Sequence, residues 1–242
     1  MRKRYKINLD DNRIRDEISK YDLKKDSEKF PSVFDSIIAK LSDDNFTVFD
    51  AQKIMDDHFT KKKYDIFISH SHTDVSYVKK LAGYYEFLGK TVFIDSEYWD
   101  FSEKLLQELD DRFSVQKDSS STYSYEKRNI TTTIIHNLLA VSLEKMINEC
   151  EYFIFVYSNN TSGANLHRLL DSASSSDAHT ISPWIYKEII TADIIYINKF
   201  EDVSKSLGGK RKITDESPLF FYDIEQLISG YYELDINNME PN

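Results

Sequence analysis

Short runs of almost uninterrupted apolar residues constrain the fold of this chain more than any other feature. They cover residues 64–69, 91–94 and 152–157, and the last is the most apolar stretch of the sequence. Strands that are apolar on both faces are typical of parallel sheets covered by helices on both sides. Shorter candidates at 219–222 and 231–234 bring the expected number of strands to five.

Segments with helical spacing of apolar residues separate these runs. One begins near Thr73 or Asp74, either of which can cap its first turn, and ends at Gly89. Others are predicted over 102–113 and 135–147, and Pro183 is well placed as the first residue of a further helix. This alternation predicts an α/β fold with a five-stranded, mainly parallel sheet and helices on both faces.

Residues 1–60 show a different pattern, with short helical stripes joined by charged turns. Their apolar residues at helical spacing are Ile14, Ile18 and Tyr21, followed by Val33, Ile37, Ile38 and Leu41. A third helix is predicted over 50–58. We therefore predict an N-terminal helical appendage over 1–60 and an α/β domain over 61–242. Within that domain, polar stretches at about 115–133 and 158–182 are predicted to be insertions.

Charge and composition argue against several kinds of partner. The formal net charge of −10 disfavours nucleic-acid binding, because phosphates need a basic surface. The basic residues Arg2, Lys3, Arg4 and Lys6 are interpreted as a solvated terminus, and the apolar stretch of a secretory signal does not follow them. No run approaches the roughly 18 apolar residues that span a bilayer.

The single cysteine, Cys150, cannot form an internal disulfide and is predicted to be a packed free thiol. The spacing of His70, His72 and His136 matches no common set of metal ligands, so no metal site is expected. We therefore expect a cytoplasmic protein that binds neither nucleic acid nor membrane.

Polar residues follow three of the predicted strands. In a parallel α/β sheet, ligands bind at the carboxyl ends of the strands, where the strand order reverses. The groups placed there are Ser69, His70, Asp95 and Ser158. These positions predict where a site lies, without naming its chemistry.

Three segments resemble the conserved boxes of TIR (Toll/interleukin-1 receptor) domains, which have a flavodoxin-like fold. They are Tyr64-Asp-Ile-Phe-Ile-Ser-His70 with Ser71-His-Thr-Asp74, then Phe93-Ile-Asp95, and Ser182-Pro-Trp-Ile-Tyr-Lys-Glu-Ile189. The resemblance covers residues 61–242. Within the family, the chain is most similar to bacterial TIR proteins of Thoeris-type antiphage defence.

The resemblance implies an NAD+ nucleosidase or ADP-ribosyl cyclase that uses NAD+ as substrate and no other cofactor. It implies that Glu188 is catalytic and that Trp184, Ser69, His70, Asp95 and Ser182 bind substrate. A homo-oligomer is expected, as is a downstream effector reached through a nucleotide second messenger. The two insertions, one of which carries Tyr123, Tyr125 and Arg128, lead us to expect a cyclic or conjugated ADP-ribose.

The chemistry of NAD+ suits these residue types. Nicotinamide is a pyridinium cation that leaves as a neutral molecule, so a single carboxylate is enough to stabilise the oxocarbenium-like transition state. Trp184 lies four residues before Glu188, hence on the same face of a helix, and an indole can stack on the pyridinium. The alternative is that Trp184 belongs to the core and Glu188 is a solvated surface charge.

Other functions fit the same fold. A non-enzymatic TIR scaffold acts by self-association and needs no carboxylate in a site. An enzyme resembling nucleoside deoxyribosyltransferases would attack another N-glycosidic bond with a glutamate. A response-regulator receiver is rejected, because Ser69-His70 and Tyr157-Ser158 occupy the places where it needs acidic residues.

Overall fold

The computed structural model describes residues 2–23, 63–116, 119–162, 179–180, 182–197, 222–235 and 238–240. The chain divides into two compact units. The first contains Met1–Leu23, Tyr64–Ile94 and Ile147–Asn242, and the second contains Lys24–Lys63 and Asp95–Met146. The predicted helices over 33–41 and 50–58 lie outside the described residues, as do positions 219–221 of one predicted strand.

The first unit is built on a five-stranded sheet in the order β3-β2-β6-β1-β9. The strands are β1 (Lys3–Asn8), β2 (Ile66–Ser69), β3 (Val92–Ile94), β6 (Tyr152–Tyr157) and β9 (Tyr232–Leu234). Every neighbouring pair is parallel. The predicted α/β class and five-stranded parallel sheet are therefore confirmed. One member differs, because β1 takes the place expected of the strand at 219–222, and Tyr222 pairs outside this sheet with Thr180.

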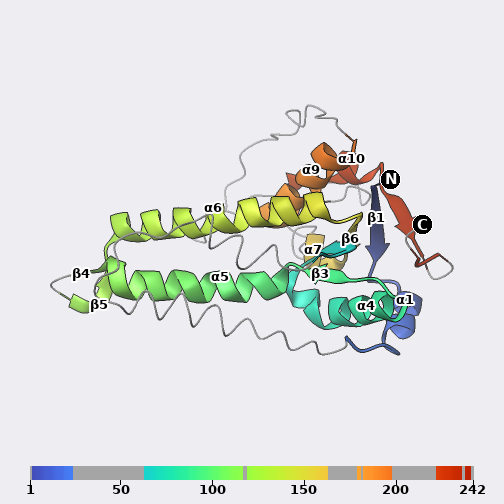
Figure 1. Cartoon of the computed structure of the whole chain (residues 1–242), viewed down its shortest axis with the longest axis horizontal. Helices are drawn as coiled ribbons and strands as arrows, with labels where there is room; N and C mark the ends of the chain where they lie inside the picture. The colour runs from blue at the N-terminus through green and yellow to red at the C-terminus, as the bar shows by residue number, and fades with distance from the viewer. Residues whose placement is uncertain are drawn as a thin grey trace, which may run out of the picture. The chain divides into compact units, whose positions relative to one another are not determined.

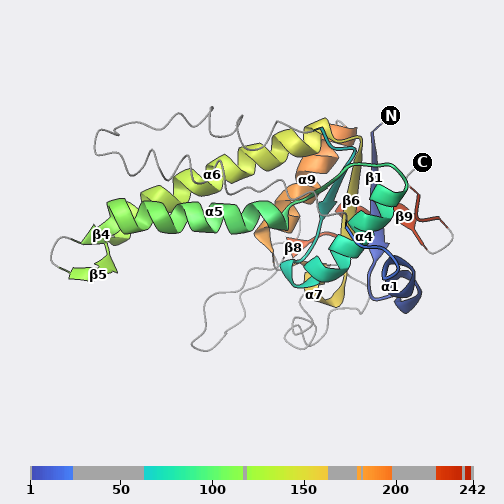
Figure 2. The same ribbon diagram turned by 60° about the horizontal axis from the view of Figure 1, so that its bottom comes forward.

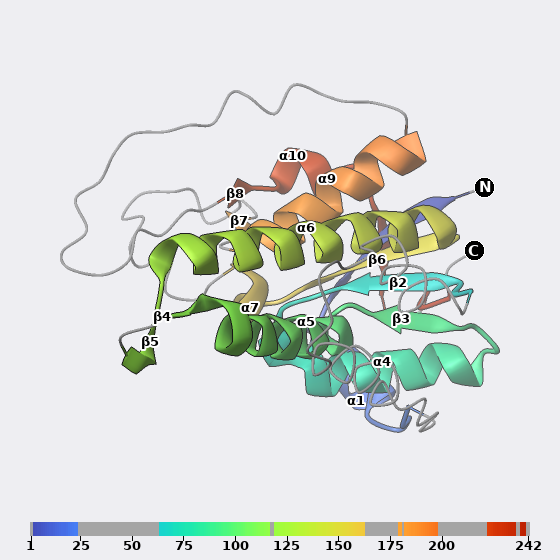
Figure 3. The ribbon, with the colours of Figure 1, turned by 60° about the vertical axis from the view of Figure 1, so that its left-hand side comes forward.

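Helices cover both faces of this sheet, as Figure 3 shows. One face is covered by α1 (Asn12–Ile18) and α4 (Val75–Phe87), whose buried side chains join those of the strands in one core. The other face is covered by α9 (Pro183–Ile197), which packs on β1 and β2. As predicted, α4 ends before Gly89, which adopts a left-handed φ of 82° that glycine accepts without strain.

The N-terminal strand corrects the prediction of a helical appendage. Strand β1 pairs with β6 on one side and with β9 on the other, so it lies inside the sheet. The flavodoxin-like fold has its strands in the order 2-1-3-4-5 across the sheet. Here β3, β2, β6 and β9 correspond to strands 2, 1, 3 and 5 of that order. Strand β1 takes the fourth place, although it comes first in the chain.

The segment after β1 is also part of the first unit. The predicted helical stripe is confirmed for Ile14 and Ile18, which are buried in the shared core, whereas Tyr21 lies beyond the end of α1. Beyond α1 the chain passes so close to α4 that a Cβ on Gly83 would lie 2.6 Å from the carbonyl carbon of Asp22. Residues 2–23 are therefore integral to the α/β fold.

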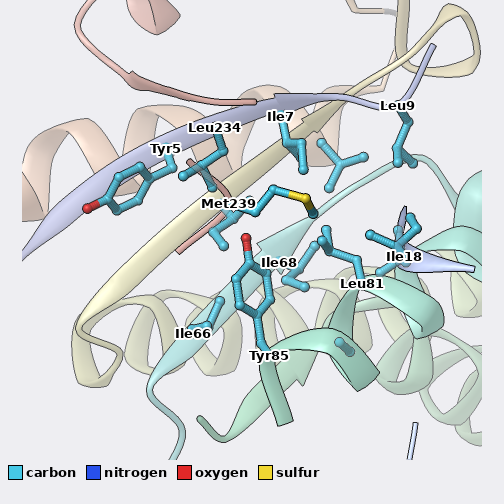
Figure 4. Packing of buried hydrophobic residues seen from close by; sticks show 14 of the residues in the cluster. Tyr5, Ile7, Leu9, Ile18, Ile66, Ile68, Leu81, Tyr85, Leu234 and Met239 are labelled. Carbon is cyan, nitrogen blue, oxygen red and sulfur yellow. The ribbon is translucent and has the colours of Figure 1, made fainter. Parts of the chain in front are cut away.

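Alternation along the strands separates the two faces. Ile66 and Ile68 point into the core beneath α1 and α4, together with Leu81 and Tyr85 (Figure 4). Phe67 and Ser69 belong to the opposite face, which α9 covers. On that face Phe67 stacks against Phe153 at 5.6 Å between ring centroids. Ser69 is thus a polar residue on an otherwise apolar face of β2, at the carboxyl end of the strand.

The second unit contains two long helices that run side by side (Figures 1 and 2). Helix α5 (Ser96–Leu109) continues into a π-helical turn, Asp110–Ser114, and a short hairpin of β4 (Val115–Gln116) and β5 (Ser119–Tyr123) leads to α6 (Tyr125–Glu149). The predicted insertion at 115–133 therefore contains this hairpin and the first turns of α6. Its polar residues do not prevent helix formation, because those turns are exposed.

Short elements complete the described part of the chain. They are α7 (Asn159–Ser162), β7 (His179–Thr180), β8 (Tyr222–Asp223) and α10 (Glu225–Ile228). Of the insertion predicted at 158–182, positions 163–178 and 181 lie outside the described residues. Within the described ranges, no helix is both long and apolar enough to cross a bilayer.

Candidate functional site

A buried hydrogen bond joins the end of β2 to α9. Ser69 Oγ donates to Glu188 Oε2 at 2.6 Å, across 119 positions of sequence. Both residues are buried, with exposed fractions of 0% for Ser69 and 2% for Glu188. The distance lies in the range of strong hydrogen bonds from a hydroxyl to a carboxylate. The structure therefore brings together two of the predicted site residues.

The start of α9 determines where Glu188 lies. Ser182 precedes Pro183, and its hydroxyl accepts a hydrogen bond from the Ile185 N–H at 3.3 Å. This is an N-cap bond, and proline is favoured at the next position. Ser182 was predicted to bind substrate; its hydroxyl has a capping role that accounts for its position. Ile189 and Glu188 are buried beyond this first turn.

Trp184 shares a helical face with Glu188, one turn earlier. Ile185, Ile189 and Ala192 are the buried apolar residues of the described part of this helix, whereas Trp184 is only half-buried. The alternative of a core tryptophan beside a solvated glutamate is therefore wrong for Glu188, which is not a solvated surface charge, and Trp184 is neither fully buried nor exposed. A half-buried indole next to a buried carboxylate can receive a flat cationic ring on its accessible part.

The other two predicted site residues lie in different surroundings. His70 follows Ser69 directly and is buried, with Nδ1 3.4 Å from the Ile68 carbonyl oxygen. Asp95 follows β3 and is also buried, but it begins the second unit at the start of α5. The first unit by itself therefore contains Ser69, His70, Trp184, Ser182 and Glu188.

A second serine–carboxylate pair follows β6, the neighbour of β2 in the sheet. Ser158 Oγ donates to Asp74 Oδ2, and Asn160 Nδ2 donates to Asp74 Oδ1 at 2.6 Å. Asp74, one of the two residues expected to cap α4, occupies the N-cap position, but its carboxylate makes no capping bond there. It holds the turn after β6 instead. Ser158 was expected at this edge of the sheet, whereas no local pattern indicated its partner.

The aromatic and basic residues of the second unit interact with one another. Arg128 Nε donates to Asp110 Oδ2 at 3.0 Å, and its guanidinium carbon lies 5.2 Å from the centre of the Tyr123 ring. Tyr123 in turn donates its hydroxyl to Asp111. Arg128 and Tyr123 belong to the insertion that led us to expect a cyclic or conjugated product, and this network already gives both of them a structural role.

Among the residues with a described placement, no three His, Cys, Asp or Glu side chains lie close enough together to hold an ion. The groups that the carboxyl edge of the sheet does offer are hydroxyls and carboxylates. These suit the hydroxyl groups and positive charge of an organic substrate.

Cys150 is confirmed as a buried free thiol. Burial raises its pKa to about 12, and the carboxylates of Glu149 and Asp65 add to this shift. We expect Cys150 to react with a disulfide reagent at pH 8 at least about a thousandfold more slowly than an unfolded cysteine, because so little thiolate is present. The measurement is the labelling rate with and without denaturant. Equal rates would contradict the buried placement.

Comparisons of the chain with protein-family models, with curated proteins and with solved structures find no match. The flavodoxin-like class therefore rests on the observed order and direction of its own strands. Within that class, the feature that points to a chemistry is the buried contact of Ser69 with Glu188.

Proposed function

We propose that this chain cleaves NAD+ at the bond between nicotinamide and ribose, with Glu188 as the catalytic carboxylate. The observation that carries the proposal is the Ser69–Glu188 hydrogen bond, buried at the carboxyl end of β2. Strand β2 lies where the chain order of the sheet reverses, since β3 lies on one side of it and β6 on the other. Ligands bind at such switch points in open α/β sheets.

The chemistry needs one negative group near the ribose. As the C–N bond breaks, its electron pair moves to the pyridinium nitrogen, and neutral nicotinamide leaves. Positive charge then develops on the ribose, where the Glu188 carboxylate stabilises it. Burial strengthens this attraction, because the surroundings screen charge less than water does. Capture of this ribosyl cation by water, with loss of a proton, would give free ADP-ribose, whereas capture by the adenine or another nucleophile would give a cyclic or conjugated form.

Ser69 and Trp184 have supporting roles in this proposal. Ser69 fixes one oxygen of the Glu188 carboxylate, so its direction is set before substrate arrives. Trp184 stacks on the nicotinamide ring, which is positively charged in the substrate and neutral in the product. Stacking of this kind favours NAD+ over the released nicotinamide.

Replacing Trp184 by alanine should impair catalysis more than folding. Because the indole is half-buried, its loss should cost less than the roughly 3–5 kcal/mol typical of a fully buried tryptophan. KM for NAD+ should rise or kcat should fall by at least about tenfold, as expected for a lost stacking contact. Ile185→Ala is the matched control, since Ile185 is buried and should affect mainly the melting temperature. The reverse ranking of the two variants would refute this role.

The resemblance to Thoeris-type TIR proteins suggests the biological setting. We propose that the chain acts in the cytoplasm, which suits its free thiol, as a self-associating enzyme of bacterial antiphage defence. Its product would be a cyclic or conjugated ADP-ribose that reaches a downstream effector. Formation of such a product requires that the adenine or another nucleophile captures the ribose before water does.

The test is incubation of the purified full chain with NAD+, followed by mass spectrometry of the products. Release of nicotinamide together with an ADP-ribosyl product supports the proposal, and the mass and retention of that product distinguish its cyclic, conjugated and free forms. Parallel incubations with purine and pyrimidine deoxynucleosides test the deoxyribosyltransferase-like alternative. Cleavage of deoxynucleosides but not of NAD+ would overturn the assignment.

Absence of turnover on all of these substrates at high protein concentration would also overturn it, and would favour a scaffold that acts by self-association. Sedimentation of the same sample then tests that alternative. A scaffold is expected to self-associate irrespective of Glu188→Gln, because it does not need a carboxylate in the site.

A further inference from the structure

A second polar contact fastens α9 to the sheet, and it comes from the N-terminal strand. Arg4 on β1 forms an ion pair with Asp193 on α9, with exposed fractions of 7% for the buried Arg4 side chain and 13% for the partly buried Asp193 side chain. Asp193 lies five residues after Glu188. The basic cluster at the N-terminus was predicted to be solvated. For Arg4 that prediction is wrong, because its guanidinium faces the helix that carries Glu188.

The surroundings of Arg4 hold it in one place. Its guanidinium carbon lies 4.6 Å from the centre of the Tyr231 ring, and that ring packs edge-on against Phe153. Arg4 and Phe153 are register partners in neighbouring strands. A planar guanidinium that both stacks and pairs is more restricted than a lysine ammonium would be. These contacts within the sheet hold the Arg4 guanidinium in place, in addition to its contact with α9.

The two contacts of α9 fall on different strands and different rows of the sheet. Ser69 lies on β2 and Arg4 on β1, with β6 between them. Ser69 is the register partner of Phe155, whereas Arg4 is that of Phe153, two residues earlier on β6. Glu188 and Asp193 therefore fasten α9 to the sheet at two separate points. A helix held at both points cannot slide or turn without breaking one contact.

We propose that Arg4 is a positioning residue for Glu188 and acts through Asp193 by setting the register of α9 on the sheet. The proposal rests on the catalytic role proposed for Glu188. It also gives a role to the N-terminal strand β1, which lies between β6 and β9 in the sheet. In that place it brings a cation to the helix of the site.

The kinetic test compares two variants on the same strand. Arg4→Met keeps an unbranched apolar stem and removes the cation. Lys6→Met makes the same kind of change two residues later on the same face, but Lys6 pairs with Glu233 on β9, at 2.9 Å, and not with α9. We expect Arg4→Met to lower kcat about tenfold to a hundredfold with KM within about twofold, as for a displaced catalytic group. Lys6→Met should keep both constants near those of the wild type.

A second readout does not depend on catalysis. The chain has two tryptophans, so Trp99→Phe leaves Trp184 on α9 as the single fluorophore. In that background Arg4→Met should increase the quenching of Trp184 by acrylamide and shift its emission maximum, whereas Lys6→Met should not. If the wild type does not cleave NAD+, the proposed function fails, and this measurement still tests whether Arg4 positions α9.

Two results would overturn the proposal. One is an Arg4→Met variant whose melting temperature is lowered while its kcat, measured well below melting, and its Trp184 quenching are unchanged. Arg4 would then contribute to stability alone. The other is an equal effect of Lys6→Met. Should Arg4→Met fail to fold, Asp193→Asn replaces it, because that change keeps the shape of the side chain and removes the charge. Wild-type kcat and quenching in Asp193→Asn would be equally decisive.

Discussion

A chain that starts at residue 61, where the change of sequence pattern suggests a domain boundary, should not fold into a stable domain. Such a chain lacks β1, so β9 loses its only described neighbour and β6 becomes an edge strand. It also lacks Ile14 and Ile18, which belong to the core beneath α1 and α4. We expect no cooperative melting transition by circular dichroism and a tendency to aggregate, because an exposed apolar edge invites pairing with other chains.

A point variant tests the same claim without truncation. Ile7 is fully buried between Val156 of β6 and Leu234 of β9. Ile7→Asp should cost about 5 kcal/mol or more, because it removes buried apolar surface and places an unpaired charge in the sheet. Since typical domains are stable by only about 5–15 kcal/mol, most of the protein should unfold.

The control is Asn8→Asp, which adds the same charge one position later. Asn8 is exposed, and its side-chain oxygen already accepts a hydrogen bond from the Asp10 N–H. A carboxylate can accept that bond equally well, so the melting temperature should stay close to that of the wild type. A stable, cooperatively folding fragment 61–242, or an Ile7→Asp variant as stable as Asn8→Asp, would contradict the central place of β1.

Replacing Glu188 by glutamine should abolish NAD+ cleavage while the fold is kept. Glutamine has nearly the same volume, and its side-chain oxygen can still accept the hydrogen bond from Ser69. The change removes only the negative charge that stabilises the ribosyl cation. Loss of one well-placed electrostatic group typically lowers kcat by about 10²–10³. The melting temperature should change little, since the contacts of α9 with the sheet remain.

Glu151→Gln is the matched control for this variant. Glu151 is exposed and precedes β6, so it lies at the amino end of the sheet, away from Ser69. The same chemical change there should leave turnover near the wild-type value. If both variants lost activity alike, the effect would come from net charge and not from a catalytic carboxylate.

The strands that sequence patterning predicts well are those with continuous apolar runs. Strands β2, β3 and β6 are buried on both faces, so almost every position is apolar. Strand β1 escaped prediction because Arg4 and Lys6 alternate with Tyr5 and Ile7. On the face of α9 those charges are paired, Arg4 with Asp193 and Lys6 with Glu233. A buried cation whose partner lies far along the chain leaves no local signal.

The site was predictable in part for a similar reason. Ser69 follows an apolar strand and Glu188 follows the capped start of a helix, so each could be placed on its own element. Their direct contact depends on how α9 crosses the sheet, which no local pattern specifies. The same holds for Asp74, whose position suggested a helix cap and whose carboxylate binds Ser158 and Asn160 instead.

The most direct test of the central claim is nicotinamide release from NAD+, followed over time at equal concentrations of the wild type and of Glu188→Gln. Both proteins are first shown to have the same melting temperature. We predict that the wild type releases nicotinamide at a rate proportional to its concentration, or rising more steeply if it self-associates. Glu188→Gln should release nicotinamide about 10²–10³ times more slowly. Equal rates in the two proteins, or no release by either, would contradict the assignment of Glu188.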